Sequence, residues 1–521
     1  MRSLIPKREK ESMSNQYIEK ILRARVYDIA VETPLEYAAL LSCRLGNAVY
    51  LKREDLQPVF SFKLRGAYNK MALLDDKARA QGVIAASAGN HAQGVALSAE
   101  KLNIDALIVM PTTTPEIKVN SVQRRGARIV LHGDSYDDAY QHALILAGEK
   151  NLTFIHPYDD PDVIAGQGTI ADEILRQIRT DIHAIFVPVG GGGLIAGIAA
   201  YVKFVRPEIK IIGVESEDSD CLNRALKAGR RVILKKVGIF ADGVAVKQIG
   251  KEPFRIAHRC VDQVITVNTD EICAAIKDIF DDTRAIAEPA GALAVAGIKK
   301  YVDEHPSLRD QNLIAIESGA NINFDRLRYV AERAEVGDHR EVLFAVTIPE
   351  QSGSFLKFCS TLGKRNITEF NYRFFDQQDA QIFVGLAAGG DEQRKQLLES
   401  IQADGFPVID MTENELAKEH MRYMVGGHAP YLLNERIYRL QFPERPGALL
   451  QFLSALGSRW NISLFHYRNH GAAFGKVLMG IQVPLAERKI LIQCLETLGF
   501  DYVEETRNPA YKIFAGGAEC N

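Results

Sequence analysis

Short runs of apolar residues alternate with helical patterns between residues 26 and 325, and this alternation constrains the fold more than any other feature. Apolar strands separated by helices form parallel sheets that are covered on both faces. The stretch is long enough for two such lobes with a cleft between them. We therefore expect an α/β fold with two lobes. The candidate strands are 82–86, 106–110, 127–131, 184–189, 209–215 and 312–317, with helices at 91–102 and 194–205.

A segment near the C-terminus repeats itself. The stretch that begins at Val346 recurs from Leu440, with an offset of 94 residues that one insertion lengthens to 95. Each copy has the pattern strand, Pro-Glu-x-x-Gly turn, helix, strand, strand, and the helix expected at 354–362 has one apolar face. A duplicated βαββ module of the α+β class is therefore expected. The recurring positions are Pro349, Glu350, Gly353, Leu356, Phe358, Leu362, Gly363, Arg365, Ile367, Phe370, Tyr372 and Arg373.

The chain has 521 residues, which is too long for a single core. A charged, helix-like segment that is interrupted at Gly337-Asp338 separates the two patterns. The sequence thus predicts an N-terminal extension (1–25), an α/β domain (26–325), a neck (326–340) and two small modules (341–425 and 435–515).

The composition excludes several classes of partner. The formal net charge is -3 and no long basic run occurs, so neither nucleic acid nor a membrane surface is expected as a partner. The longest apolar stretch is too short to span a membrane, and the N-terminus does not resemble a signal peptide. Seven scattered cysteines without a CxxC pair argue against disulfides and zinc sites. We expect a cytoplasmic protein without a metal site.

Lys63 lies between aromatic and apolar neighbours in the segment SFKLRGA. Lysine is normally a solvated surface residue. An amine that is partly withdrawn from water has a lowered pKa and can act as a nucleophile or form an imine. Taken alone, the position also fits a lysine that extends into water from the start of a helix.

Two turns from a strand into a helix are candidate anion sites, because backbone N–H groups point outward at a helix N-terminus. The first is SAGNH, where Ser87 and Asn90 add side-chain donors; ordinary N-capping explains it equally well. The second has four consecutive glycines, Gly190, Gly191, Gly192 and Gly193. Without Cβ atoms, the backbone of this second turn can approach a phosphate closely.

Ser318 stands at the C-terminal end of the strand expected at 312–317. Ligands collect at this end of the strands in open α/β sheets. A serine before glycine is otherwise an ordinary turn residue.

Together these segments resemble the fold-type-II pyridoxal-phosphate enzymes, of the tryptophan synthase β type, and specifically the biosynthetic threonine dehydratases. The resemblance covers about residues 25–514 and includes SFKLRGA, SAGNHAQGVA, GGGGL, FADGVAV and AEPAGALA, in that order. The duplicated tail resembles the paired ACT-like regulatory modules of that family.

The resemblance implies a role for each matched residue. Lys63 would carry pyridoxal phosphate and act as the catalytic base. The four glycines, with Leu194, would hold its phosphate. Asn90 would bond its 3′-oxygen, and Ser318 would face its ring nitrogen. The substrate carboxylate would lie among Ser87, Gly89, Asn90 and His91.

The implied reaction is the loss of water and then ammonia from L-threonine, which gives 2-oxobutanoate in the committed step of isoleucine biosynthesis. L-serine would be a secondary substrate, isoleucine an inhibitor, valine an opposing effector, and the assembly a homotetramer. In serine racemases of this fold, the matching segment resembles SSGNH, with a second serine as the acid on the opposite face. Here that position is Ala88, which cannot carry a proton, so little racemisation is expected.

Three alternatives fit parts of the pattern. A catabolic serine/threonine dehydratase generally resembles the first part without two such modules. A β-replacing synthase requires a second substrate. An inactive amino-acid-binding regulator does not need the lysine, the glycine run and Ser318 together.

Overall fold

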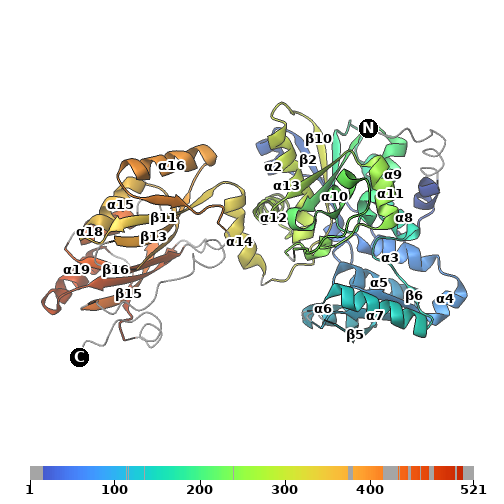
Figure 1. The fold of residues 1–521 in the computed structure, drawn as a ribbon, viewed down its shortest axis with the longest axis horizontal. Coiled ribbons are helices and arrows are strands. Elements are labelled where there is room, and N and C mark those ends of the chain that lie inside the picture. Colours follow the sequence, from blue (N-terminus) through green and yellow to red (C-terminus); the bar gives the residue numbers. More distant parts are fainter. Residues whose placement is uncertain are drawn as a thin grey trace. The chain divides into compact units, whose positions relative to one another are not determined.

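The computed structural model describes residues 16–507 except 113, 115, 134, 239, 325, 374–378, 415–431, 433, 444–447, 458, 469–473 and 499–501. The chain divides into two compact units, Met1–Ala334 and Glu335–Asn521 (Figure 1). The division falls within α14 (Arg326–Gly337), inside the stretch predicted as a neck. Each unit is described by itself.

The first unit contains a six-stranded sheet with the order β1-β2-β10-β7-β8-β9. All neighbours in it are parallel except β1 and β2. Alternate residues of the strand β7 point to opposite faces. Ala184 and Phe186 pack in one apolar core with α13, whereas Ile185 and Val187 pack in another with α8 and α9. The strands are β1 (Leu35–Tyr37), β2 (Ala48–Arg53), β7 (Ala184–Pro188), β8 (Lys210–Ser216), β9 (Gln263–Val267) and β10 (Asn312–Glu317).

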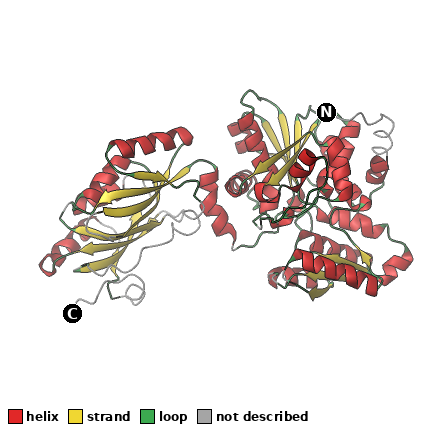
Figure 2. Cartoon of the chain, in the orientation of Figure 1, coloured by secondary structure: helices red, strands yellow, loops and turns green. Residues whose placement is uncertain are grey.

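A four-stranded parallel sheet, β5-β4-β3-β6, forms the second lobe of this unit. Val83 and Ala85 pack against α5, and Ile84 and Ala86 pack against α7, so helices cover both faces here as well (Figure 2). The strands are β3 (Val83–Ala86), β4 (Ala106–Met110), β5 (Arg128–Leu131) and β6 (Thr153–Phe154). The predicted two-lobed α/β fold is confirmed, with each predicted strand within one residue of its observed bounds.

The helices of the first unit connect these strands. They are α2 (Ala39–Leu45), α3 (Lys63–Ala72), α4 (Asp76–Gln81), α5 (Asn90–Leu102), α6 (Glu116–Gln123), α7 (Tyr136–Glu149), α8 (Pro161–Gln177), α9 (Gly193–Val205), α10 (Cys221–Ala228), α11 (Lys251–Cys260), α12 (Thr269–Thr283) and α13 (Pro289–Glu304). Among the described residues, no helix has the length and apolar character needed to cross a membrane.

The second unit is an eight-stranded antiparallel sheet with the order β14-β11-β13-β12-β16-β17-β15-β18. The two repeats meet in its centre, where β12 pairs with β16 and Phe370 lies opposite Tyr467. The strands are β11 (Glu341–Pro349), β12 (Ile367–Arg373), β13 (Asp379–Ala387), β14 (Val408–Asp410), β15 (Glu435–Pro443), β16 (Asn461–Arg468), β17 (Phe474–Gln482) and β18 (Tyr502–Glu504).

Within the described residues, each repeat contains one more helix and one more strand than predicted. The helices are α15 (Ser354–Leu362), α16 (Asp391–Ala403), α18 (Ala448–Leu456) and α19 (Arg488–Leu498). The element order in each repeat is therefore βαββαβ. The helix predicted at 354–362 is confirmed, and it buries Phe355, Phe358, Cys359 and Leu362 on one face. Gly447, which was expected in the second turn, lies outside the described residues.

Candidate active site and a pocket between the repeats

The C-terminal ends of β3, β7 and β10 each lead into a segment that the sequence singled out. Backbone hydrogen bonds join the segment after β10 to the start of α3 and to the residue before α13. The N–H of Phe62 donates to Ser318 O at 3.3 Å, and the N–H of Glu288 donates to Gly319 O at 3.0 Å. The first residue of α3, the end of β10 and the start of α13 therefore surround one place.

Lys63 is the first residue of α3. Its Nζ atom donates to Pro157 O at 3.2 Å and lies 5.2 Å from the centre of the Phe62 ring. Desolvation lowers the pKa of this amine to about 8, although the nearby charge of Glu288 acts in the opposite direction. An amine with this pKa is a better nucleophile and base at neutral pH than an ordinary lysine.

The glycine turn has no room for side chains. A Cβ atom on Gly191 would lie 2.1 Å from the Tyr158 ring, and one on Gly190 would lie 2.9 Å from the Val244 backbone. Gly192 has a φ of 89° and caps α9 without a side-chain hydrogen bond. The first N–H groups of α9, including that of the buried Leu194, therefore face a cradle of backbone atoms, which suits a phosphate.

The SAGNH turn leads into α5, which begins at Asn90 and has Gly89 as its N-cap. A Cβ atom on Gly89 would meet nothing within 4 Å, so open space adjoins this helix N-terminus. The Ser87 hydroxyl accepts a hydrogen bond from the N–H of Gly89 at 3.2 Å. A small anion such as a carboxylate fits here.

His91 has a structural contact rather than a free imidazole. Its Nε2 atom lies 2.8 Å from Ile155 O, and only 3% of the residue is exposed. Burial lowers the pKa of His91 to about 3, so the ring is neutral at pH 7. A neutral ring that donates from Nε2 to Ile155 O holds the start of α5 against the segment after β6.

Ser318 follows the last residue of β10 and is buried. Its hydroxyl donates to Ala290 O at 3.3 Å, close to the start of α13. The lone pairs of its Oγ atom remain able to accept, and a hydroxyl can also turn its proton toward another acceptor.

Four residues of the site were missed in the sequence. They are Pro157, whose carbonyl oxygen holds Lys63, Tyr158, which packs on the glycine turn, Glu288, which accepts from Asn90, and Asn321, which donates to Asn90. The motif AEPAGALA contains Glu288, and a carboxylate next to a helix-starting proline was the available signal.

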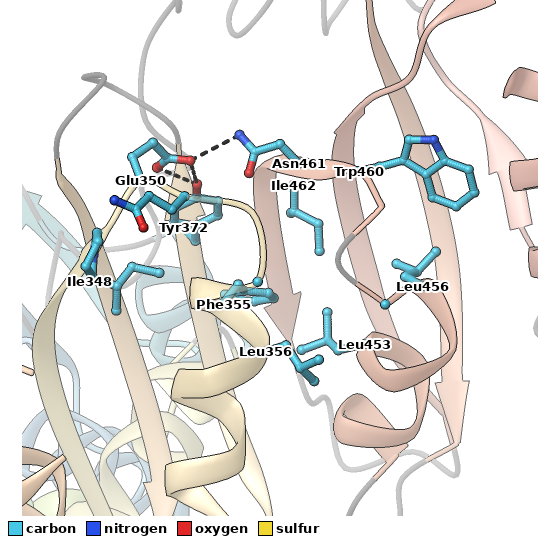
Figure 3. A pocket seen from close by; sticks show the side chains of 14 residues that line it. Ile348, Glu350, Phe355, Leu356, Tyr372, Leu453, Leu456, Trp460, Asn461 and Ile462 are labelled. Atoms are coloured by element: carbon cyan, nitrogen blue, oxygen red, sulfur yellow. Dashed lines mark hydrogen bonds between the residues drawn. The ribbon is translucent and has the colours of Figure 1, made fainter. Parts of the chain in front are cut away.

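A pocket lies between the two repeats of the second unit (Figure 3). Its lower part is apolar, with Phe355 and Leu356 from α15 facing Leu453 and Leu456 from α18. Its upper part is polar and contains Glu350. Such a combination suits a small molecule with one charged and one aliphatic end.

The carboxylate of Glu350 is held from both repeats. The Tyr372 hydroxyl donates to its two oxygens at 2.7 Å, and Asn461 Nδ2 donates to Oε1 at 3.2 Å. Burial raises the pKa of Glu350, whereas the two hydrogen bonds act in the opposite direction. A cation that enters the pocket would therefore recover part of the cost of burying this carboxylate.

Comparisons with known proteins agree with these two units. Residues 26–319 match the family described as "Pyridoxal-phosphate dependent enzyme". Residues 332–421 and 426–515 each match the "C-terminal regulatory domain of Threonine dehydratase". The lysine amine, the glycine cradle and the polar groups at the strand ends fit pyridoxal phosphate as the cofactor.

The "L-threonine dehydratase biosynthetic IlvA" of Burkholderia multivorans is 58% identical, over 96% of this chain and 99% of that protein. The protein of the same name from Escherichia coli is 53% identical, over 96% of this chain and 97% of its own length. The structure of the processed form of threonine deaminase isoform 2 from Solanum lycopersicum has a TM-score of 0.61 and 50% identity, and covers 62% of this chain and 89% of that one. The chain therefore belongs to the biosynthetic threonine dehydratases, the pyridoxal-phosphate-dependent enzymes that carry a C-terminal regulatory domain.

Proposed function

We propose that this chain removes water and ammonia from L-threonine to give 2-oxobutanoate, with L-serine as a secondary substrate. The observation that carries the proposal is the desolvated Lys63 amine, which donates to Pro157 O, while the next residue, Tyr158, packs on the glycine cradle. Pyridoxal phosphate, when bound, supplies the electron sink that makes the Cα–H bond of an amino acid acidic.

The residues around that cofactor divide the work. The Lys63 amine removes the proton from Cα, and the same Nζ atom then protonates the hydroxyl that leaves Cβ. One water molecule departs, and the remaining enamine hydrolyses to 2-oxobutanoate and ammonia. The open N-terminus of α5 at Gly89 holds the substrate carboxylate, with Ser87 beside it.

Ser318 would limit how much negative charge accumulates on the cofactor ring. A hydroxyl opposite a ring nitrogen cannot keep it protonated as a carboxylate would, so long-lived carbanions are disfavoured. This environment favours rapid elimination over transamination. Ser318→Asp is therefore expected to increase the proportion of transamination side products relative to 2-oxobutanoate.

The decisive experiment measures 2-oxobutanoate and ammonia from threonine alone. Lys63→Ala is expected to abolish both products, because no other amine replaces it at the cofactor. A need for a second substrate would indicate a β-replacing synthase instead. Pure protein that binds amino acids but lacks the visible absorption of the cofactor would indicate an inactive regulator.

We further propose that the pocket between the repeats binds isoleucine as the inhibitor, with valine as an opposing ligand. Glu350 would pair with the α-ammonium group, and the N-terminus of α15 would face the carboxylate. Phe355, Leu356 and Leu453 would enclose the branched side chain. A bound effector changes activity only if it favours one of two domain arrangements.

Glu350→Gln tests this assignment. It removes the charge but keeps an acceptor for Tyr372, so we expect about a tenfold or greater loss of isoleucine affinity with basal activity unchanged. Glu399→Gln on the exposed face of α16 is the matched control. Calorimetry on the full chain measures the affinity; unchanged binding in Glu350→Gln would place the effector elsewhere.

We also expect a homotetramer in the cytoplasm. The resemblance supports the assembly, and the scattered cysteines support a reducing compartment; none of the six described cysteines forms a disulfide. Light scattering of the holoenzyme checks the assembly.

A further inference from the structure

The side-chain amide of Asn90 is held between two other polar side chains. Asn321 Nδ2 donates to Asn90 Oδ1 at 2.6 Å, and Asn90 Nδ2 donates to Glu288 Oε1 at 2.6 Å. These residues come from the segment after β10, the start of α5 and the residue before α13. Both atoms at the end of the Asn90 side chain thus have a partner from another part of the chain.

The direction of this relay follows from a fourth group. Asn321 Nδ2 also donates to the backbone oxygen of Val59 at 2.8 Å. A carbonyl oxygen only accepts, so the Asn321 atom beside it is the amide nitrogen. That nitrogen then donates to Asn90, which places the Asn90 oxygen on this side and its nitrogen toward Glu288.

We propose that Glu288 and Asn321 are positioning residues, which fix the Asn90 amide so that its second N–H faces the 3′-oxygen of the cofactor. An amide nitrogen carries two protons, and Glu288 occupies one of them. The other remains for a ligand. A reversed amide would offer that ligand an oxygen, which repels a second oxygen.

Glu288 suits this task in both of its protonation states. Burial and the nearby Asp242 raise its pKa to about 7, while Asn90 and Lys118 act in the opposite direction. Lys118 is paired with Asp242 at 2.8 Å, and the Lys63 amine also senses the charge of Glu288. A carboxyl group accepts through an oxygen whether it is ionised or neutral, so Asn90 keeps its orientation across neutral pH.

The inference rests on the proposed function and on the role that the family resemblance implies for Asn90, a bond to the 3′-oxygen of the cofactor. Asn90→Ala tests that role by itself. If Asn90→Ala leaves the absorption and retention of the cofactor unchanged, the proposed role of Asn90 fails. If Asn90→Ala alters them and the variants below do not, only the positioning role fails.

Asn321→Asp is designed to reverse the relay. An ionised aspartate only accepts, so it draws Asn90 Nδ2 toward itself and turns the Asn90 oxygen toward Glu288 and the cofactor. Adding Glu288→Gln supplies a donor to the turned oxygen, which satisfies every bond of the reversed relay. The contact with Val59 changes equally in the single and double variants, so the pair is matched.

The readouts are the thermal midpoint of the apoprotein, the visible absorption of the holoenzyme, and cofactor affinity from dialysis. We expect Asn321→Asp to lower the midpoint, and the double variant to recover it. Both variants should bind the cofactor about tenfold more weakly and absorb more at short wavelength, because the 3′-oxygen of the cofactor loses a hydrogen-bond donor.

Glu288→Gln alone retains an acceptor for Asn90 and should stay within about threefold of the parent affinity. If Asn321→Asp does not fold, Glu288→Leu replaces it, with Glu288→Gln as the conservative rescue. Cofactor affinity that recovers together with the thermal midpoint in the double variant would overturn the proposal. So would equal affinities in Glu288→Leu and Glu288→Gln.

Discussion

The Nζ atom of Lys63 lies 3.2 Å from the carbonyl oxygen of Pro157, a residue 94 positions away in the sequence. The carbonyl oxygen orients the amine by accepting a hydrogen bond from it, but it carries no full charge. The pKa of the amine is therefore set mainly by desolvation and by Glu288. With a pKa of about 8, a much larger fraction of this amine is neutral near physiological pH than of an ordinary lysine, although the protonated form still predominates.

The first prediction concerns the pH dependence of cofactor loading. Only the neutral amine attacks an aldehyde, so the rate at which apoprotein takes up pyridoxal phosphate should rise through pH 8 and level off above it. Glu288→Gln removes the charge that raises the Lys63 pKa and should move the midpoint lower. Stopped-flow absorption measures the rate. A midpoint near the ordinary lysine value of about 10.5 would contradict the role of desolvation.

The second prediction concerns the glycine cradle. Gly191→Ala places a Cβ atom 2.1 Å from the Tyr158 ring, and the His156 ring, 4.7 Å from that ring, limits its movement. The turn must open, so cofactor affinity should fall about tenfold or more. Gly148→Ala in α7 is the control, because its Cβ atom meets nothing within 4 Å. Equal cofactor content in the two variants would show that the turn does not contact the cofactor.

The third prediction concerns a buried charge network two residues beyond Lys63. Arg65 is fully buried; it donates to both oxygens of Glu54 at 2.8 Å and to both oxygens of Glu173, at 2.5 Å to Oε1 and 2.9 Å to Oε2. Arg65→Met leaves these carboxylates less compensated, at a cost of about 3–5 kcal/mol. A lower thermal midpoint of the first unit, measured by calorimetry, is the expected result.

Arg206→Met is the control for that measurement, because Arg206 pairs with Glu208 in water. It should leave the midpoint unchanged. Equal midpoints for the two variants would mean that the Arg65 network does not stabilise the catalytic unit.

The fourth prediction concerns the opposite face of the substrate. Ala88 has no proton to deliver, so D-allothreonine from L-threonine and D-serine from L-serine should form at least about a hundredfold more slowly than 2-oxobutanoate. Ala88→Ser should increase racemisation, which chiral chromatography of the product mixture detects. Racemisation at a rate comparable to deamination in the parent enzyme would refute this explanation.

The features that could be predicted from the sequence are those that depend on residues close together in the chain. The strand that ends at Pro188 and the glycine turn after it carry their signals within a few positions. The relay to Asn90 does not, because Glu288 and Asn321 are 198 and 231 positions away. Nothing local shows that these three side chains meet until two lobes have folded.

The extra helix and strand of each repeat were missed for a related reason. α16 and α19 share few residues at equivalent positions, although they occupy equivalent places in the two repeats. Their faces need only be apolar toward the sheet, as with Leu397 and Leu491. Identity between the copies is concentrated in the turn, the first helix and the strand after it.

The pairing of β12 with β16 makes each repeat depend on the other for the protection of its sheet edge. Once the two copies had joined through these strands, a shortened chain that ended between them would expose the backbone N–H and C=O groups along β12. Such an unprotected edge promotes aggregation. Each repeat therefore shields the other from aggregation, and neither can be removed without exposing a strand edge.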